Sequence, residues 1–148
     1  MKIAVRYYSR GGATEKVAKA IAREAGERAE TTDRGLDKKV DLLFIGSGIY
    51  KGHIDSHVKD FVESLDASKV GKVVFFSTAM LGGGKSDEEI GKLLSEKGIP
   101  MDTRTFHCHG KFLFFHRGHP DKKDLLDAEI FAPWIPELHN KDSRKELA

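Results

Sequence analysis

One stretch near the N-terminus constrains the fold of this chain more than any other. Residues 2–14 read KIAVRYYSRGGAT, a β-branched and aromatic run followed by a polar turn with two glycines. Helical spacing of apolar residues resumes directly after the turn, so we predict a β-strand that opens through a loop onto a helix. The free backbone N–H groups and the positive end of the helix dipole make such a loop a ready phosphate site.

The residues of this loop favour some phosphate ligands over others. Ser9 and Thr14 offer hydroxyl donors, while Gly11 and Gly12 let the backbone approach a ligand closely. The loop lacks both the Gly-Lys-Ser/Thr ending of a P-loop and the G-x-G-x-x-G of a dinucleotide site, so neither of those ligands is favoured. A plain strand-to-helix turn is the alternative, because glycine and serine are common in turns.

The rest of the chain repeats the pattern of strand, loop and helix. Further strands are predicted at residues 29–33, 41–46, 72–77 and 101–107, and helices at residues 13–25, around 54–65, from Ser86 to just before Gly98, and at 121–131. Ser86 and Glu89 have the spacing of a capping box at the third helix. Strands alternating with helices predict an α/β fold with a parallel sheet covered on both faces. We expect one domain over residues 1–139 and a polar tail over 140–148.

Composition excludes several classes of protein. The chain has 148 residues and a formal net charge of +2, too balanced to favour binding to nucleic acid or an anionic membrane. No apolar segment is long enough for a membrane span, and the N-terminus enters a strand directly, so we expect a cytoplasmic protein. A single cysteine, Cys108, excludes an internal disulfide and fits a reducing compartment.

Three glycine-rich loops leave the carboxyl ends of the predicted strands. They cover residues 9–14, 46–52 and 77–84. In an open parallel sheet, ligands bind outside these strand ends, where the strand order reverses. The loops therefore predict one shared pocket.

These loops resemble those of the flavodoxin-like family. The resemblance implies a doubly wound five-stranded parallel sheet of order 2-1-3-4-5, a three-layer α/β/α fold and FMN as the cofactor. The implied cofactor-binding residues are Ser9, Arg10, Gly11, Gly12, Ala13 and Thr14 in the first loop, Gly48, Ile49, Tyr50, Lys51 and Gly52 in the second, and Thr78, Ala79, Met80, Leu81 and Gly82 in the third. Gly11 and Ala13 replace the hydroxyl residue and the asparagine usual in the family, and Arg10 supplies a positive charge. Residues 48–55 also look like the corresponding loop of the menaquinone-dependent protoporphyrinogen dehydrogenases.

Single residues leave alternatives open. Tyr50 either stacks on the flavin ring or is an ordinary half-buried tyrosine. Five residues close in sequence could invite a metal: His107, Cys108, His109, His116 and His119. They form no known ligand motif, so we expect no metal, and we expect Cys108 to be a structural thiol.

Two classes of function follow. The first is an FMN-binding redox protein that transfers electrons or reduces or dehydrogenates a small molecule such as a quinone, with a partner protein or a small molecule as donor or acceptor. The second is a cofactor-free interaction module on the same fold. Carrier flavodoxins are strongly acidic, whereas this chain is slightly basic, which favours an FMN-dependent oxidoreductase within the first class.

Overall fold

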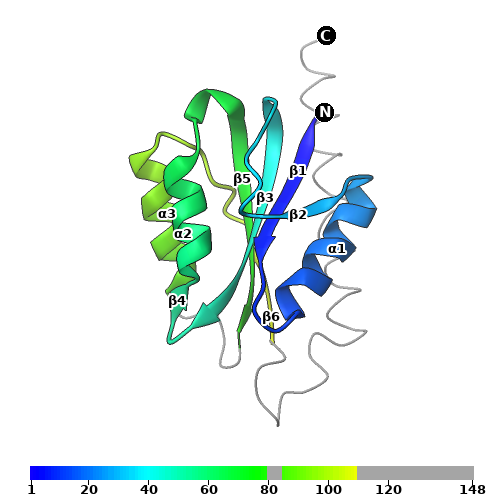
Figure 1. Cartoon of the computed structure of the whole chain (residues 1–148). Coiled ribbons are helices and arrows are strands. Elements are labelled where there is room, and N and C mark those ends of the chain that lie inside the picture. The colour runs from blue at the N-terminus through cyan, green and yellow to red at the C-terminus, as the bar shows by residue number, and fades with distance from the viewer. Residues whose placement is uncertain (80–84, 110–148) are drawn as a thin grey trace.

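The computed structural model describes residues 1–79 and 85–109 (Figure 1). The strands are β1 (Ile3–Tyr8), β2 (Ala29–Thr31), β3 (Val40–Tyr50), β4 (His53–Ile54), β5 (Val70–Ala79) and β6 (Phe106–His109). The helices are α1 (Ala13–Ala25), α2 (Ser56–Ser64) and α3 (Ser86–Glu96), with a short 3₁₀ turn at Ala67–Lys69. The helix predicted at residues 121–131 and the tail at 140–148 lie outside the described residues.

The sheet is parallel along its main path. Its order is β2-β1-β3-β5-β6, and β4 pairs with β3 off this path as an antiparallel strand. Numbered along the chain without β4, the parallel strands follow the order 2-1-3-4-5, which confirms the predicted doubly wound fold. The order reverses between β1 and β3, so the switch point lies at their carboxyl ends.

Helices cover both faces of the sheet. In Figure 1, α1 lies on one side of the sheet and α2 and α3 lie on the other. Side chains of β1 alternate between the faces, because successive residues of a strand point to opposite sides. Val5 packs into the core under α1, whereas Ala4 packs into the core under α2 and α3. The helical spacing of residues 13–25 predicts α1 correctly, and Val17 and Ile21 are fully buried in it.

Strand β3 is longer than predicted. The apolar run at residues 41–46 was expected to end in a glycine-rich loop, but the strand continues through Gly48 to Tyr50. Glycine is needed at Gly46 because a Cβ there would lie 2.2 Å from the ring of Phe76 on β5. The glycines that indicated a loop therefore serve close packing inside the sheet.

The connection from β2 to β3 contains no helix. Residues 32–39, all of them described, cross the sheet as turns and irregular chain. Arg6 on β1 lies beneath this crossing and is 8% exposed. Its Nε donates to the Arg34 carbonyl at 2.9 Å and its Nη2 to the Gly35 carbonyl at 3.2 Å. A buried guanidinium thus fixes a crossover that parallel strands usually make with a helix.

Two local predictions are wrong. The last strand was predicted at residues 101–107, but β6 spans Phe106–His109, and Met101 makes only an isolated bridge to Val73. The capping box at Ser86 does not form: Lys85 is the N-cap residue, and no described side chain caps α3. Glu89 instead accepts a hydrogen bond from the Ile54 backbone N–H at 2.7 Å. The Glu89 carboxylate, which the local spacing assigned to the helix cap, therefore binds β4 instead.

Candidate functional site

The first loop joins the carboxyl end of β1 to the N-terminus of α1. Ser9 Oγ accepts a hydrogen bond from the Gly12 backbone N–H at 2.9 Å, which closes the turn. Gly12 has a φ of 92°, a left-handed conformation that favours glycine. Within the described residues no side chain caps α1. The N–H groups of its first turn have no acceptor inside the helix and are available to an anion.

Thr14 links the first loop to the end of β5. Its hydroxyl lies 2.7 Å from the hydroxyl of Thr78, and both residues are fully buried. Either oxygen can be the donor. If Thr78 donates, the Thr14 proton is available to a ligand, and if Thr14 donates, it is not. The contact brings together two residues that the sequence assigned to separate loops of one pocket.

The second loop is a tight hairpin. Tyr50 pairs with His53 across it, and the two residues between them, Lys51 and Gly52, have φ values of 53° and 83°. Two successive positive φ angles are typical of the type I′ turn that matches the twist of paired strands. The hairpin carries Tyr50 at the end of β3, beside the first loop.

Tyr50 lies between Gly48 and Arg10. A Cβ at Gly48 would be 2.6 Å from the Tyr50 hydroxyl, so the glycine makes room for the tyrosine side chain. The Arg10 guanidinium carbon lies 4.1 Å from the centroid of the Tyr50 ring, within the range of a cation–π contact. Burial raises the pKa of Tyr50 and outweighs the opposing effect of Arg10, so the phenol stays protonated at neutral pH.

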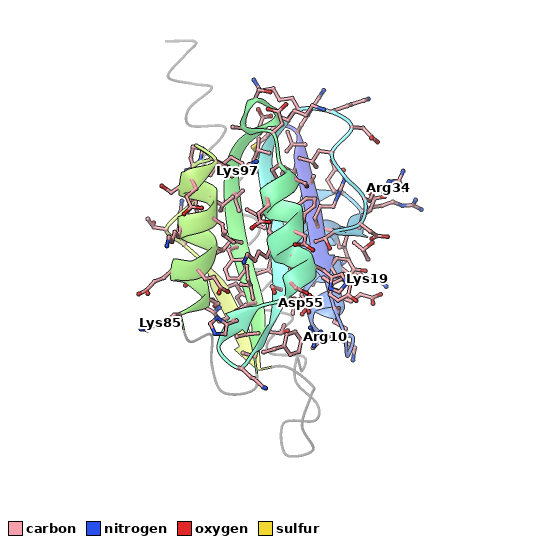
Figure 2. The ribbon with its side chains drawn as sticks, turned by 60° about the vertical axis from the view of Figure 1, so that its left-hand side comes forward. Arg10, Lys19, Arg34, Asp55, Lys85 and Lys97 are labelled. Atoms are coloured by element: carbon pink, nitrogen blue, oxygen red, sulfur yellow. The ribbon has the colours of Figure 1, made fainter. Side chains whose placement is uncertain are left out.

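Arg10 also pairs with Asp55, the N-cap residue of α2. Its Nε donates to Asp55 Oδ2 at 2.8 Å, and Figure 2 shows both residues at the same end of the molecule. The Asp55 side chain is fully buried, whereas that of Arg10 is 52% exposed. The ion pair therefore connects the first loop to the start of α2.

Asp55 is held by several contacts besides Arg10. Its Oδ1 accepts from the His57 backbone N–H at 2.8 Å, which is the N-cap bond of α2. The same oxygen lies 2.8 Å from His57 Nδ1. Burial alone would raise the pKa of Asp55, but the hydrogen bonds from His57 and the charge of Arg10 outweigh it and lower the pKa. Asp55 is therefore a carboxylate at neutral pH.

His57 extends this polar chain toward β1. Its ring stacks on Tyr8 with centroids 3.8 Å apart and an interplanar angle of 7°. Tyr8 and His57 also line a surface cavity of about 250 Å³, together with Asp33 and Asp60. The chain of contacts from Tyr8 to Tyr50 therefore spans the carboxyl ends of β1 and β3.

A second polar chain lies at the end of β5. Ser77 hydrogen-bonds to Nδ1 of His107 on β6, and His107 Nε2 lies 3.0 Å from Asp87 Oδ2 on α3. Ser77 is fully buried. His107 thereby ties together the residues on either side of the third glycine-rich segment.

The structure brings four of the predicted site residues together in two pairs. Arg10 and Tyr50 meet at one point, and Thr14 and Thr78 meet at another. Ile49 and Ala79 are also at the strand ends, but their side chains pack into the hydrophobic core. Met80, Leu81 and Gly82 lie outside the described residues.

Sequence reasoning did not assign Asp55 or His57 to the site, and it considered His107 only as a possible metal ligand. Asp55 had a usable signal, since an aspartate directly before a helical pattern is a common N-cap. No sequence signal indicated the contacts of His57 and His107, because the order and register of the strands decide which residues they meet. In the described ranges, no group of three or more His, Cys, Asp or Glu side chains could hold a metal ion. None of the described helices is both long and apolar enough to cross a membrane.

Comparisons with known proteins agree with this fold. A family model described as Flavodoxin domain matches residues 4–113. A flavodoxin structure from the domain Archaea superposes with a TM-score of 0.72 at 21% identity, covering 93% of this chain and 97% of that one. Oxidised flavodoxin 2 from Bacillus cereus gives a TM-score of 0.66 at 18% identity, covering 93% and 99%. A flavoprotein in complex with FMN from Lactobacillus acidophilus gives 0.59 at 18% identity, covering 74% and 93%. A search of curated protein sequences returned no match.

Proposed function

The chain belongs to the flavodoxin family of domains, and from that premise we propose that it binds FMN and acts as a redox protein. FMN would supply the ring that accepts and releases electrons. The protein would supply binding, orientation and the charge around that ring.

One observation carries the proposal: the uncapped N-terminus of α1 lies at the same strand edge as Tyr50. The first turn of α1 offers backbone N–H donors and, among described residues, has no side-chain cap. Arg10, in the same loop, adds a cation and contacts the Tyr50 ring. Anion donors next to an aromatic surface fit a phosphate and a flat ring in one ligand.

A titration of flavin-free protein with FMN and FAD tests the proposal. A terminal monophosphate suits the closed loop at residues 9–14, whereas a pyrophosphate favours a fingerprint that this chain lacks. We expect FMN to bind more tightly than FAD and mass spectrometry of the denatured protein to identify FMN as the released flavin. Equal affinities, or no binding of either flavin, would contradict the proposal.

A matched pair of variants locates the site. Gly11→Glu places a carboxylate in the first loop, where it should repel the phosphate and weaken FMN binding. Gly35→Glu adds the same charge at a position with open space around it, on the β2–β3 connection, and should leave the affinity unchanged. Equal effects of the two variants would place the flavin elsewhere.

Within the redox class, we propose an oxidoreductase that acts on a small molecule such as a quinone. The net charge of +2 supports this choice over a carrier that depends on strong acidic steering. The local similarity of residues 48–55 to the menaquinone-dependent protoporphyrinogen dehydrogenases points the same way. The single cysteine suits a reducing compartment, so we propose the cytoplasm as its location.

Rapid mixing of the reduced protein with a water-soluble naphthoquinone distinguishes an enzyme from a carrier. A binding site for the quinone predicts that the rate of reoxidation saturates as quinone concentration rises. A rate that stays proportional to concentration throughout would argue for simple collisional transfer. A protein that binds no flavin at all would instead support the cofactor-free interaction module.

A further inference from the structure

The ion pair between Arg10 and Asp55 joins a half-exposed cation to a fixed anion. Arg10 Nε lies 2.8 Å from Asp55 Oδ2, and the guanidinium carbon lies 4.1 Å from the Tyr50 ring centroid. Figure 2 shows the pair from the α2 side of the molecule, with Arg10 reaching from the first loop toward the start of α2. A long arginine side chain at the surface would otherwise sample many rotamers.

Asp55 is the fixed member of the pair. Its backbone N–H donates to Ser47 Oγ at 2.9 Å, and its Oδ1 caps α2 through the His57 N–H. Its side chain has no solvent exposure. With Oδ1 engaged by His57, the carboxylate presents Oδ2 to Arg10. The position of Asp55 therefore selects the Arg10 conformation that contacts Tyr50.

We infer that Asp55 positions Arg10 against Tyr50, and that this pair of opposite charges sets how much more tightly the site binds reduced than oxidised flavin. The inference rests on the proposed function, because it concerns the same site. Reduction adds electron density to a flavin, so a nearby cation favours the reduced form and a nearby carboxylate disfavours it. The ratio of the two affinities fixes the reduction potential by linkage.

The inference predicts shifts of opposite sign in two variants. Arg10→Gln leaves the Asp55 charge uncompensated, so the reduced form should bind about three- to tenfold more weakly relative to the oxidised form, and the potential should fall. Asp55→Asn removes the anion and should shift the same ratio the other way, so the potential should rise. A tenfold change corresponds to about 30 mV for a two-electron couple. Arg10→Lys, which keeps the charge, should stay closer to wild type than Arg10→Gln.

The Asp55 variants are chosen to preserve folding. Asparagine keeps one oxygen to cap α2 and presents its NH₂ group to Arg10, so the helix keeps its N-cap while the ion pair is lost. Asp55→Ser, in which the serine hydroxyl can cap α2 without a negative charge, serves as the second variant. Thermal melting of the flavin-free proteins checks that α2 remains packed.

Two measurements decide the outcome. Redox titration of the FMN-loaded proteins should give the opposite shifts, with the double variant Arg10→Gln/Asp55→Asn closer to wild type than either single one. In the flavin-free proteins, NMR should show an Arg10 Nε–H signal protected from exchange in wild type and lost in Asp55→Asn. Shifts of the same sign, no shift, or an unchanged Nε–H signal would overturn the inference while FMN binding stands. Failure of the wild-type protein to bind flavin would overturn the proposed function itself.

Discussion

Tyr50 contacts the first loop through its aromatic ring. The ring faces the Arg10 guanidinium, whose carbon lies 4.1 Å from the ring centroid, and the hydroxyl lies over Gly48, where a Cβ would be 2.6 Å away. These contacts place a half-buried aromatic ring beside the uncapped end of α1. The half-buried position agrees with one of the two sequence interpretations of Tyr50, and stacking on a flavin stays a prediction.

The Tyr50→Ala variant separates these roles. If the ring stacks on the flavin, its loss removes about 0.5 to 1.5 kcal/mol beyond area burial, and FMN affinity should fall more for the oxidised than for the reduced form. By linkage, the reduction potential should then rise, as redox titration will show. Tyr50→Phe keeps the ring and is the control, with a potential close to wild type. Unchanged affinity and potential in Tyr50→Ala would place the ring away from the flavin.

Thr14 has a structural partner that the sequence did not indicate. The sequence, with Thr14 at a helix start facing the loop, predicts that Thr14→Val weakens FMN binding by about 1 to 3 kcal/mol and leaves folding almost unchanged. The buried contact with Thr78 changes the second expectation, since valine would leave the Thr78 hydroxyl buried without this partner. The variant should lose about 1 to 3 kcal/mol of unfolding free energy as well.

Urea unfolding of the flavin-free protein measures this loss. Thr14→Ser keeps the hydroxyl and should recover most of the stability and most of the FMN affinity. Full stability in Thr14→Val would show that the Thr14–Thr78 contact contributes nothing net. Full FMN affinity in the same variant would remove Thr14 from the proposed phosphate site.

At the scale of elements, we expect the contacts at the start of α2 to stabilise the fold to an extent that depends on pH. Asp55 caps this helix and binds Arg10, and its pKa is lower in the folded protein than in the unfolded chain. A group with a lowered folded pKa stabilises the fold above its unfolded pKa, about 3.9 for aspartate, and loses that contribution as pH falls through the folded value. The contribution of Asp55 is therefore complete at neutral pH and disappears in acid.

A comparison of wild type with Asp55→Asn measures this contribution. At pH 7 the variant should unfold at lower urea concentration, with a loss of about 1 to 3 kcal/mol. The difference between the two proteins should shrink as the pH is lowered below about 4, because the wild-type carboxylate becomes protonated. A difference that stays constant from pH 7 to pH 3 would show that the charge of Asp55 does not stabilise the fold.

At the scale of the whole molecule, Arg6 binds the connection between β2 and β3. It donates to the carbonyls of Arg34 and Gly35 and lies 3.4 Å from Glu30. Arg6→Leu should cost about 3 kcal/mol of unfolding free energy, because it leaves these carbonyls without their donor under a connection that has no helix of its own.

Arg34→Leu is the matched control for Arg6→Leu. Arg34 pairs with the same Glu30 but its side chain is 65% exposed, so its loss should cost less than about 1 kcal/mol. Urea unfolding of both variants decides the comparison. Equal losses would show that the surface charge of Glu30, and not the crossover, accounts for the effect of Arg6.

The sequence alone determined the features that depend on local pattern. The bounds of α1 and the buried run at the centre of β3 follow from apolar spacing and glycine stops, and the parallel sheet follows from the alternation of strands and helices. The order of the strands came from the resemblance to the flavodoxin-like family. These patterns reflect the burial of neighbouring residues, so they can be read along the chain.

Only the tertiary structure decided which side chains meet. Thr14 and Thr78 are 64 positions apart, and Arg10 and Asp55 are 45 apart, so no local pattern links either pair. Register decides such contacts: β1, β3 and β5 bring Tyr8, Ser47 and Ser77 side by side at the carboxyl edge. A shift of one residue would turn each of these side chains to the other face of the sheet. The contacts of the site therefore depend on how the whole sheet packs, whereas the helices and strands that carry the site can be predicted from the local spacing of apolar residues.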